Sequence, residues 1–171
     1  GYQAHDIVPD VITFAKGAGN GVTLAGVVAR AEIMDTITAL SFSTFGGNPL
    51  SAAGGLATLR YVIRNDLQGN AKRMGQRLVD RLGPVVDATP WIAELRGRGL
   101  MQAIEMVQPD SIEPDAARAG EVLEHAKARG LLVGKGGLYG NSIRIAPMLN
   151  VTESEIDEGV GEGWGTSDGG H

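Results

Sequence analysis

The chain has 171 residues, with 20 acidic and 15 basic side chains, and its net charge at pH 7 is −5. This balance offers no basic face for nucleic acid, and no apolar run approaches the ~20 residues that would span a membrane. Because cysteine is absent, disulfides and thiolate chemistry are excluded, and the composition fits a protein of the cytoplasm.

The first third of the chain is predicted to alternate short strands with glycine-rich loops. Residues 10–15 are apolar and β-prone, so we expect a buried strand that ends at Lys16 and is followed by a glycine loop. Residues 24–29 predict a second strand, and residues 31–34 a short helix. Asn48 is a suitable N-cap and Pro49 suits the first helical position, so a longer helix is expected behind them.

Two helices with apolar faces follow. The first is expected to bury Ala52, Leu56, Leu59 and Ile63. The second, from about residue 68 to 82, is expected to bury Ala71, Met74, Leu78 and Leu82 and to end at Gly83-Pro84.

From about residue 90 the pattern changes to short strands around one long helix. The strands are predicted at residues 91–95, 100–107, 131–133 and 143–146, and the helix at 114–129. Thr152 and Glu155 form a capping box for a last helix. Alternate glycines from Gly159 onward should weaken that helix, so we expect a poorly ordered tail after about residue 160. This mixture predicts an α/β or α+β unit.

Few side chains in the sequence are suited to catalysis or metal binding. The three histidines, His5, His125 and His171, are scattered without ligand spacing, so no metal site is predicted. The glycines of residues 17–21 match neither a P-loop nor a dinucleotide fingerprint, and no Gly-x-Ser-x-Gly elbow is present.

Lys16 is the lysine whose surroundings best suit chemistry. It ends an apolar strand and precedes glycines that let the backbone approach a ligand closely. An amine at the edge of an apolar core is desolvated, and we expect its pKa to be lowered, as a Schiff-base lysine requires. Residue chemistry alone also allows an exposed lysine at a strand end.

The segment around Lys16 closely resembles the cofactor-lysine segment of class-III aminotransferases, which are pyridoxal-phosphate enzymes of fold type I. The match covers residues 9–21, PDVITFAKGAGNG. Residues 43–49, STFGGNP, are similar to the segment whose threonine hydroxyl holds the pyridoxal phosphate of the neighbouring subunit.

Further matches lie in the second half of the chain. Residues 96–101, RGRGLM, and 144–147, RIAP, are similar to small-domain signatures of the family. With residues 134–141, GKGGLYGN, the sequence is nearest to the alanine–glyoxylate and 4-aminobutyrate aminotransferase branch. The resemblance runs from about residue 2 to 160 and departs at Met148, where the family more often has a second proline.

The resemblance implies an α/β fold in two parts. Residues 1–66 would be the C-terminal remnant of the large cofactor-binding domain, and residues 67–171 the small C-terminal domain. Lys16 would carry pyridoxal 5′-phosphate as a Schiff base and transfer protons. Thr44 and Ser43 would bind its phosphate, and Arg144 the substrate carboxylate. For Arg144 the alternative is a surface ion pair.

The implied activity is transfer of an amino group from an amino acid or ω-amino acid to a 2-oxo acid, by a homodimer in the intact protein. Family chains are more than twice this long, and their upstream half supplies a phosphate loop, a stacking aromatic ring and an aspartate. We therefore expect this C-terminal fragment to be inactive by itself. Two alternatives stay open: a related enzyme such as an aminomutase or racemase, and a non-catalytic dimerisation module. The amino donor is not determined by the sequence.

Overall fold

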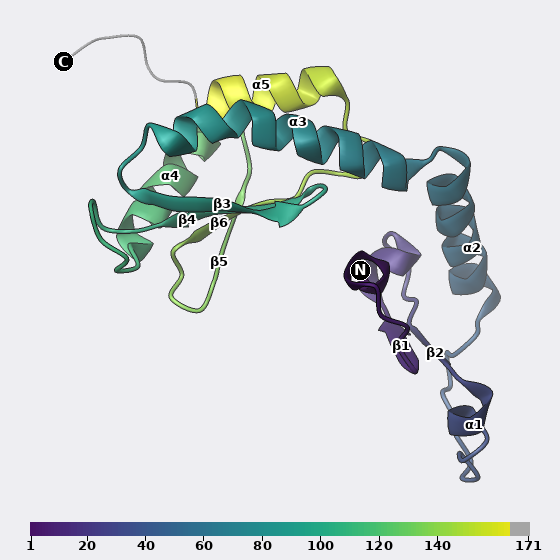
Figure 1. Ribbon diagram of the computed structural model, residues 1–171. Helices are drawn as coiled ribbons and strands as arrows, with labels where there is room; N and C mark the ends of the chain where they lie inside the picture. Colours follow the sequence, from purple (N-terminus) through teal and green to yellow (C-terminus); the bar gives the residue numbers. More distant parts are fainter. Residues whose placement is uncertain (165–171) are drawn as a thin grey trace. The chain divides into compact units, whose positions relative to one another are not determined.

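A computed structural model gives the structure of residues 1–164 (Figure 1). The chain divides into two compact units, Gly1–Asn65 and a second that begins at Asp66. Each unit has a sheet of its own, and we describe the two separately.

The first unit contains one two-stranded antiparallel sheet, in which β1 (Val11–Phe14) pairs with β2 (Gly26–Ala29). Its helical elements are η1 (Tyr2–His5), η2 (Lys16–Gly19), α1 (Ala31–Met34) and α2 (Pro49–Arg64). The predicted cap of α2 is confirmed, because the Asn48 side chain accepts a hydrogen bond from the Ser51 N–H at 2.9 Å.

The strand that leads to Lys16 is more exposed than the sequence predicts. Val11 keeps 44% of its surface exposed and Phe14 keeps 41%, and only Ile12 of β1 is half-buried. A two-stranded ribbon buries its side chains only where another layer covers it. The prediction of a buried strand is therefore wrong for this chain, although the strand itself is present.

The buried face of α2 also differs from the prediction. Leu56, Leu59 and Ile63 are exposed, whereas Ser51 and Gly55 are the buried residues of this helix. Hydrophobic periodicity pointed to the wrong face because α2 packs against a loop, where small residues allow close approach.

The second unit is a four-stranded antiparallel sheet with helices packed on one face. The strands lie in the order β3 (Ile92–Arg98), β4 (Met101–Met106), β6 (Ser142–Ile145) and β5 (Gly134–Gly136). The helices are α3 (Leu67–Asp87), α4 (Ala116–Ala128) and α5 (Glu153–Trp164). Figure 1 shows α3 and α5 running alongside each other over the sheet. The mixed helix-and-sheet fold predicted for this half is confirmed.

The core of this unit lies between the sheet and its helices. Leu82 of α3, Ile104 of β4 and Ile143 of β6 are fully buried, and Ala119 of α4 joins them. Met74 and Leu78 are buried beside Leu82, so the apolar face predicted for α3 is confirmed.

Three predicted boundaries in the second unit are shifted. Helix α3 continues past Pro84 to Asp87, although the proline removes one backbone N–H donor from the helix. Val85 and Val86 are half-buried in this last turn. Residues 131–133 form no strand, and β5 pairs instead through Gly134–Gly136, since an apolar run reports burial rather than ladder hydrogen bonds. Helix α5 extends to Trp164, beyond the point where order was expected to end, and residues 165–171 lie outside the described part.

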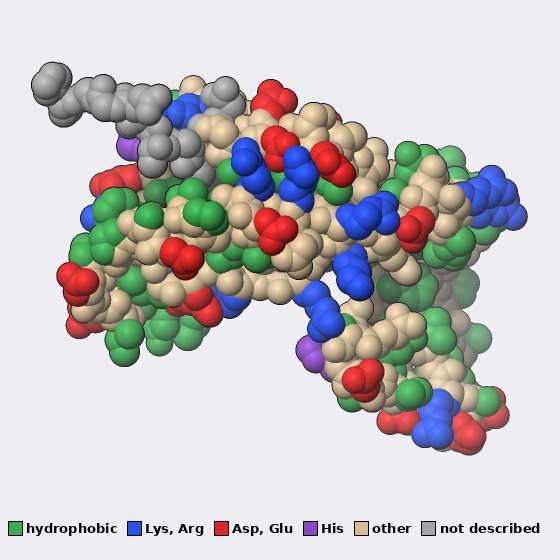
Figure 2. All heavy atoms as spheres, turned by 45° about the horizontal axis from the view of Figure 1, so that its top comes forward, with side chains coloured by type: hydrophobic (Ala, Val, Ile, Leu, Met, Phe, Trp, Pro, Cys, Tyr) green, Lys and Arg blue, Asp and Glu red, His purple; other side chains and the backbone are tan. Residues whose placement is uncertain are grey.

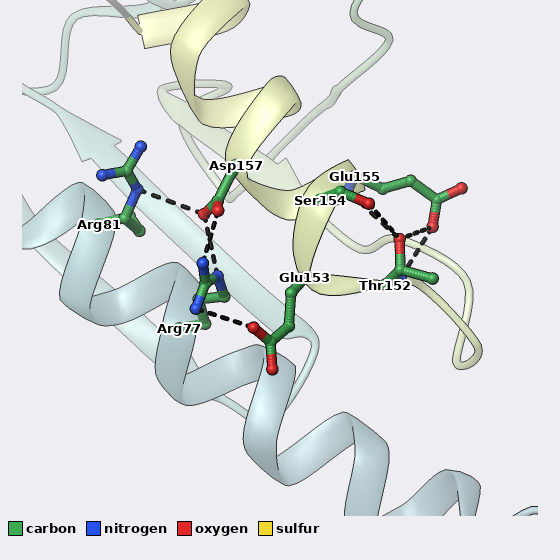
Figure 3. Close-up of polar contacts among 7 residues, drawn as sticks. All are labelled: Arg77, Arg81, Thr152, Glu153, Ser154, Glu155 and Asp157. Atoms are coloured by element: carbon green, nitrogen blue, oxygen red, sulfur yellow. Dashed lines mark hydrogen bonds and ion pairs between the residues drawn. The ribbon is translucent and has the colours of Figure 1, made fainter.

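Ion pairs join α3 to the start of α5 (Figure 3). Arg77 donates to Asp157 at 2.9 Å and pairs with Glu153 at 3.3 Å, while Arg81 approaches Asp157 at 3.5 Å. The predicted capping box is confirmed, since the Thr152 N–H donates to Glu155 at 2.8 Å and the Glu155 N–H to the Thr152 hydroxyl at 3.3 Å. The hydrogen bond from Arg77 holds the pKa of Asp157 below its ordinary value of 3.8.

Asp157 is expected to stabilise the folded chain in a pH-dependent way. Because the folded-state pKa is lowered, the contribution is complete above the unfolded pKa and disappears as pH falls through the folded one. Asp157→Asn should lower the urea midpoint at pH 7, and the difference from wild type should vanish in strong acid. Glu158→Gln, an exposed neighbour on α5, is the control. A difference that stays constant with pH would contradict this expectation.

On the face of the molecule in Figure 2, acidic and basic side chains are interspersed over the helices of the second unit. Within residues 1–164, no helix has both the length and the apolar character needed to cross a membrane.

Candidate functional site

Lys16 lies where β1 ends and the backbone turns. Its φ is +54°, in the left-handed region, directly after a fully extended Ala15. The amides of Ala18, Asn20 and Val22 donate to carbonyls three residues earlier at 3.1–3.2 Å and build the turn. A non-glycine residue in the left-handed region costs about 1–3 kcal/mol and persists only where its surroundings hold it, a feature that concentrates at functional sites.

The Lys16 side chain is exposed and borders a shallow recess that it shares with Ala15 and residues 21–25. No hydrogen bond or ion pair engages its amine within residues 1–164. The desolvation that the sequence predicts is therefore not found in this chain, because β1 has no second layer over it. The amine nevertheless has no partner among the described residues, and a ligand can reach it.

A second recess adjoins the first. It is lined by Ser43 and the following glycine turn on one side and by residues 23–25 on the other. Residues 23–25 also border the Lys16 recess. The segments around Lys16 and Ser43, which the sequence singled out, therefore both lie beside residues 23–25. Thr44 is exposed beside Ser43, and the Gly46 N–H is already used by the Ser43 carbonyl at 3.1 Å.

These residues fit a ligand that carries an aldehyde and a phosphate. An unpaired primary amine can condense with an aldehyde, and hydroxyl groups such as those of Ser43 and Thr44 donate hydrogen bonds to phosphate oxygens. The observation in favour is that Lys16 borders a recess and that Ser43 and Thr44 are exposed, where a ligand of this chain or of a second copy can reach them.

Arg144 belongs to the second unit and projects from β6 next to glycine. It pairs with Gly134 on β5 and Ala103 on β4, and its guanidinium nitrogens lie 3.2–3.3 Å from where a Gly134 side chain would begin. Among the described residues, no carboxylate pairs with it, so the surface ion pair considered as an alternative is not present there. A guanidinium without a partner is suited to a ligand carboxylate.

Arg96 differs from Arg144 because it is neutralised. It donates to Glu94 at 2.7 Å and also pairs with Glu105, which accepts a further hydrogen bond from buried Asn141 at 3.2 Å. The Asn141 hydrogen bond, and next that of Arg96, hold the pKa of Glu105 below its usual 4.5. The sequence analysis did not single out Glu105 or Asn141. The spacing of two residues between Glu94 and Arg96 does place these two side chains on one face of β3.

Lys135, which also stands in a glycine loop, is used structurally. Its ammonium donates to the Ala116 carbonyl at 2.7 Å, and Lys127 pairs with Glu124 at 3.2 Å on α4. Lys72 is exposed on α3 and, like Lys16, has no hydrogen-bond or ion-pair partner among the described residues, but it borders no recess such as the one beside Lys16.

Comparisons with known proteins identify the family. The model of the aminotransferase class-III family matches residues 1–162. The chain is 40% identical over 159 residues to alanine–glyoxylate aminotransferase 2 homolog 2, mitochondrial, of Arabidopsis thaliana, covering 92% of this chain and 33% of the relative. It is 39% identical to the 4-aminobutyrate aminotransferase of Mycobacterium leprae, covering 91% of this chain and 35% of that protein.

The fold is also found in solved structures. A phospholyase from Arthrobacter, in complex with phosphoethanolamine, superposes with a TM-score of 0.90 at 32% identity over 95% of this chain and 39% of that one. The chain thus spans about a third of the length of the curated relatives it matches. The family expected from residues 9–21 and 43–49 is confirmed: this chain belongs to the class-III aminotransferases.

Proposed function

We propose that this chain is part of a pyridoxal-phosphate-dependent transaminase in which Lys16 binds the cofactor. The supporting observation is Lys16 itself, which has a left-handed backbone, borders a recess and has no partner among residues 1–164. In this proposal residues 1–66 are the end of the large cofactor-binding domain and residues 67–171 the small domain.

Each residue of the site has a distinct task. Pyridoxal phosphate, when bound, supplies an electron sink for the substrate carbanion. The Lys16 amine would hold the cofactor by condensing with its aldehyde, with loss of water, and would act as the general base that takes the proton from the substrate carbon. The hydroxyls of Ser43 and Thr44 orient the phosphate, in a partner copy if the intact protein is a homodimer.

The substrates we propose are an amino acid or ω-amino acid as donor and a 2-oxo acid as acceptor. The names of the relatives, alanine–glyoxylate and 4-aminobutyrate aminotransferases, favour this class. Arg144 would bind the donor carboxylate through its two-pronged guanidinium.

Removing the Arg144 fork is expected to weaken binding of carboxylate substrates. In the intact protein, Arg144→Ala should raise KM for an amino-acid donor by about 10- to 100-fold, since hydrogen bonds to charged groups contribute about 1.5–3 kcal/mol. Arg144→Lys should recover little, because one ammonium cannot replace the fork. Steady-state kinetics with a donor amine lacking a carboxylate is the control, and an equal KM rise for both donors would contradict this role.

Borohydride reduction tests the cofactor assignment. The chain is mixed with pyridoxal phosphate, reduced and digested, and the pyridoxyl group is located by peptide mass mapping. We expect the group on Lys16 in preference to Lys72, Lys127 and Lys135. Even labelling of the four lysines would support the alternative of a non-catalytic module with an exposed Lys16.

By itself this chain is expected to be inactive. It spans about a third of its relatives' length, and the family parts that hold the pyridine ring lie in the remainder. Chain mixed with pyridoxal phosphate, an amino donor and a 2-oxo acid should give no sustained keto-acid formation. Sustained turnover would show that residues 1–171 suffice.

A related pyridoxal-phosphate reaction is the second candidate. The observation that favours it is the match to a phospholyase structure, which shows that one fold serves more than one reaction. An aminomutase or racemase would use the same lysine for proton transfer. Exchange of the substrate α-proton without keto-acid formation, in the intact protein, would distinguish these from a transaminase.

A further inference from the structure

Two adjacent glycines of helix α2, Gly54 and Gly55, lie close to the segment that contains Lys16. We call residues 16–25 the lysine loop. A methyl group on Gly55 would overlap Leu24 Cδ2, and one on Gly54 would lie 2.7 Å from Val22 Cγ2, closer than such atoms approach. The glycines therefore form a groove on α2, and Val22 and Leu24 of the lysine loop occupy it.

Leu24 is also confined from the other side. Gly19, the one buried residue of η2, faces it, and a side chain there would lie 3.2 Å from Leu24 Cβ and 3.4 Å from its amide nitrogen. Leu24 is thus held between Gly19 of its own loop and Gly55 of α2. Gly19 lies near the Cβ end of the Leu24 side chain and Gly55 near its Cδ2 end, so both glycines position the loop through Leu24.

The same helix carries the second part of the candidate site. Helix α2 starts at Pro49, directly after the turn of residues 43–48, and Gly55 lies two turns further along, a rise of about 10 Å from Asn48. A rigid helix that holds the Ser43 turn at its start and Leu24 in its groove sets the separation between the two segments.

We propose that Gly54 and Gly55 are positioning residues for Lys16, because their missing side chains let Val22 and Leu24 seat the lysine loop on α2. This inference rests on the proposed function of Lys16 as the cofactor lysine. Neither glycine contacts the cofactor in this proposal, and both act through the loop.

Amide hydrogen exchange measured by NMR on the whole chain tests the contact without any cofactor. In Gly55→Ala, the amides of Ala18, Asn20 and Val22 should exchange about tenfold faster, as expected for overpacking. Alanine favours a helix over glycine, so loosening cannot come from α2 propensity. Adding Leu24→Ala should restore slow exchange, because the smaller side chain makes room for the new methyl group.

Gly161→Ala is the control, since Gly161 is also helical, in α5, and a methyl group there would have nothing within 4 Å. It should leave the lysine loop unchanged. Equal exchange in the Gly55 and Gly161 variants, or no rescue by Leu24→Ala, would overturn the inference.

Reductive labelling with pyridoxal phosphate gives the second readout. Gly55→Ala should lower the share of label on Lys16 by about fivefold relative to the other lysines, and Leu24→Ala should restore it. Unchanged labelling despite faster exchange would overturn the positioning role. If wild type labels all lysines evenly while exchange responds as expected, the cofactor assignment fails and the contact between loop and helix stands.

Discussion

Replacing Lys16 by alanine is expected to abolish tight binding of pyridoxal phosphate to the intact protein. The amine is the one group of the candidate site that can bond covalently to the aldehyde, and the hydroxyls of Ser43 and Thr44 offer only exchangeable hydrogen bonds. Equilibrium dialysis should show saturable binding for wild type and only weak binding for Lys16→Ala.

Two variants separate covalent chemistry from charge. Lys16→Arg keeps a cation at the end of β1 but cannot condense with the aldehyde, so it should bind as weakly as Lys16→Ala. Lys72→Ala removes a lysine of α3 and should bind like wild type. Retained tight binding in Lys16→Arg would mean that the site recognises only the phosphate.

Substituting Gly75 by alanine is expected to destabilise the second unit strongly. Gly75 is buried on α3, and a methyl group there would overlap the carbonyl and Cα of Gly99. Gly99 is itself in the left-handed region, with φ +55°, at the turn between β3 and β4, so this backbone has little freedom to move away. Overpacking of this kind costs about 1–3 kcal/mol, and a backbone obstacle places Gly75→Ala at the upper end.

Urea unfolding followed by circular dichroism measures this effect. Gly161→Ala, on α5 of the same unit and with nothing within 4 Å of the added methyl group, should be neutral or stabilising by up to about 1 kcal/mol. If Gly75→Ala matched Gly161→Ala, the tight approach of α3 to the β3–β4 turn would be wrong.

Features of the fold that depend on neighbouring residues in sequence were predictable. The Asn48 cap, the buried face of α3 and the Thr152–Glu155 capping box each rest on residues within one or two helical turns. Each was found as expected because the same short segment carries both the signal and the interaction.

Features that depend on distant partners were not predictable. The buried face of α2 is set by Leu24 and Val22, which lie about thirty residues earlier, so its leucines were assigned to the wrong side. Similarly, α3 passes through Pro84 to Asp87 with Val85 and Val86 half-buried, which the Gly83-Pro84 pattern did not indicate.

The residues of the candidate site could be proposed from the sequence, and their physical state could not. Lys16 was singled out by its residue chemistry and the segment around Ser43 by its resemblance to the family. The exposure of Lys16, its left-handed backbone and the glycine groove beneath its loop depend on tertiary packing. Arg144 has no carboxylate partner among the described residues, and this too depends on which side chains the neighbouring strands place beside it.

The claim on which the function depends is that the amine of Lys16 bonds to the cofactor. A crystal structure of the chain grown with pyridoxal phosphate tests it most directly. We predict continuous density from Lys16 Nζ to the aldehyde carbon of the cofactor. A Lys16 side chain free in solvent, with the cofactor absent or joined to Lys135, would contradict the assignment.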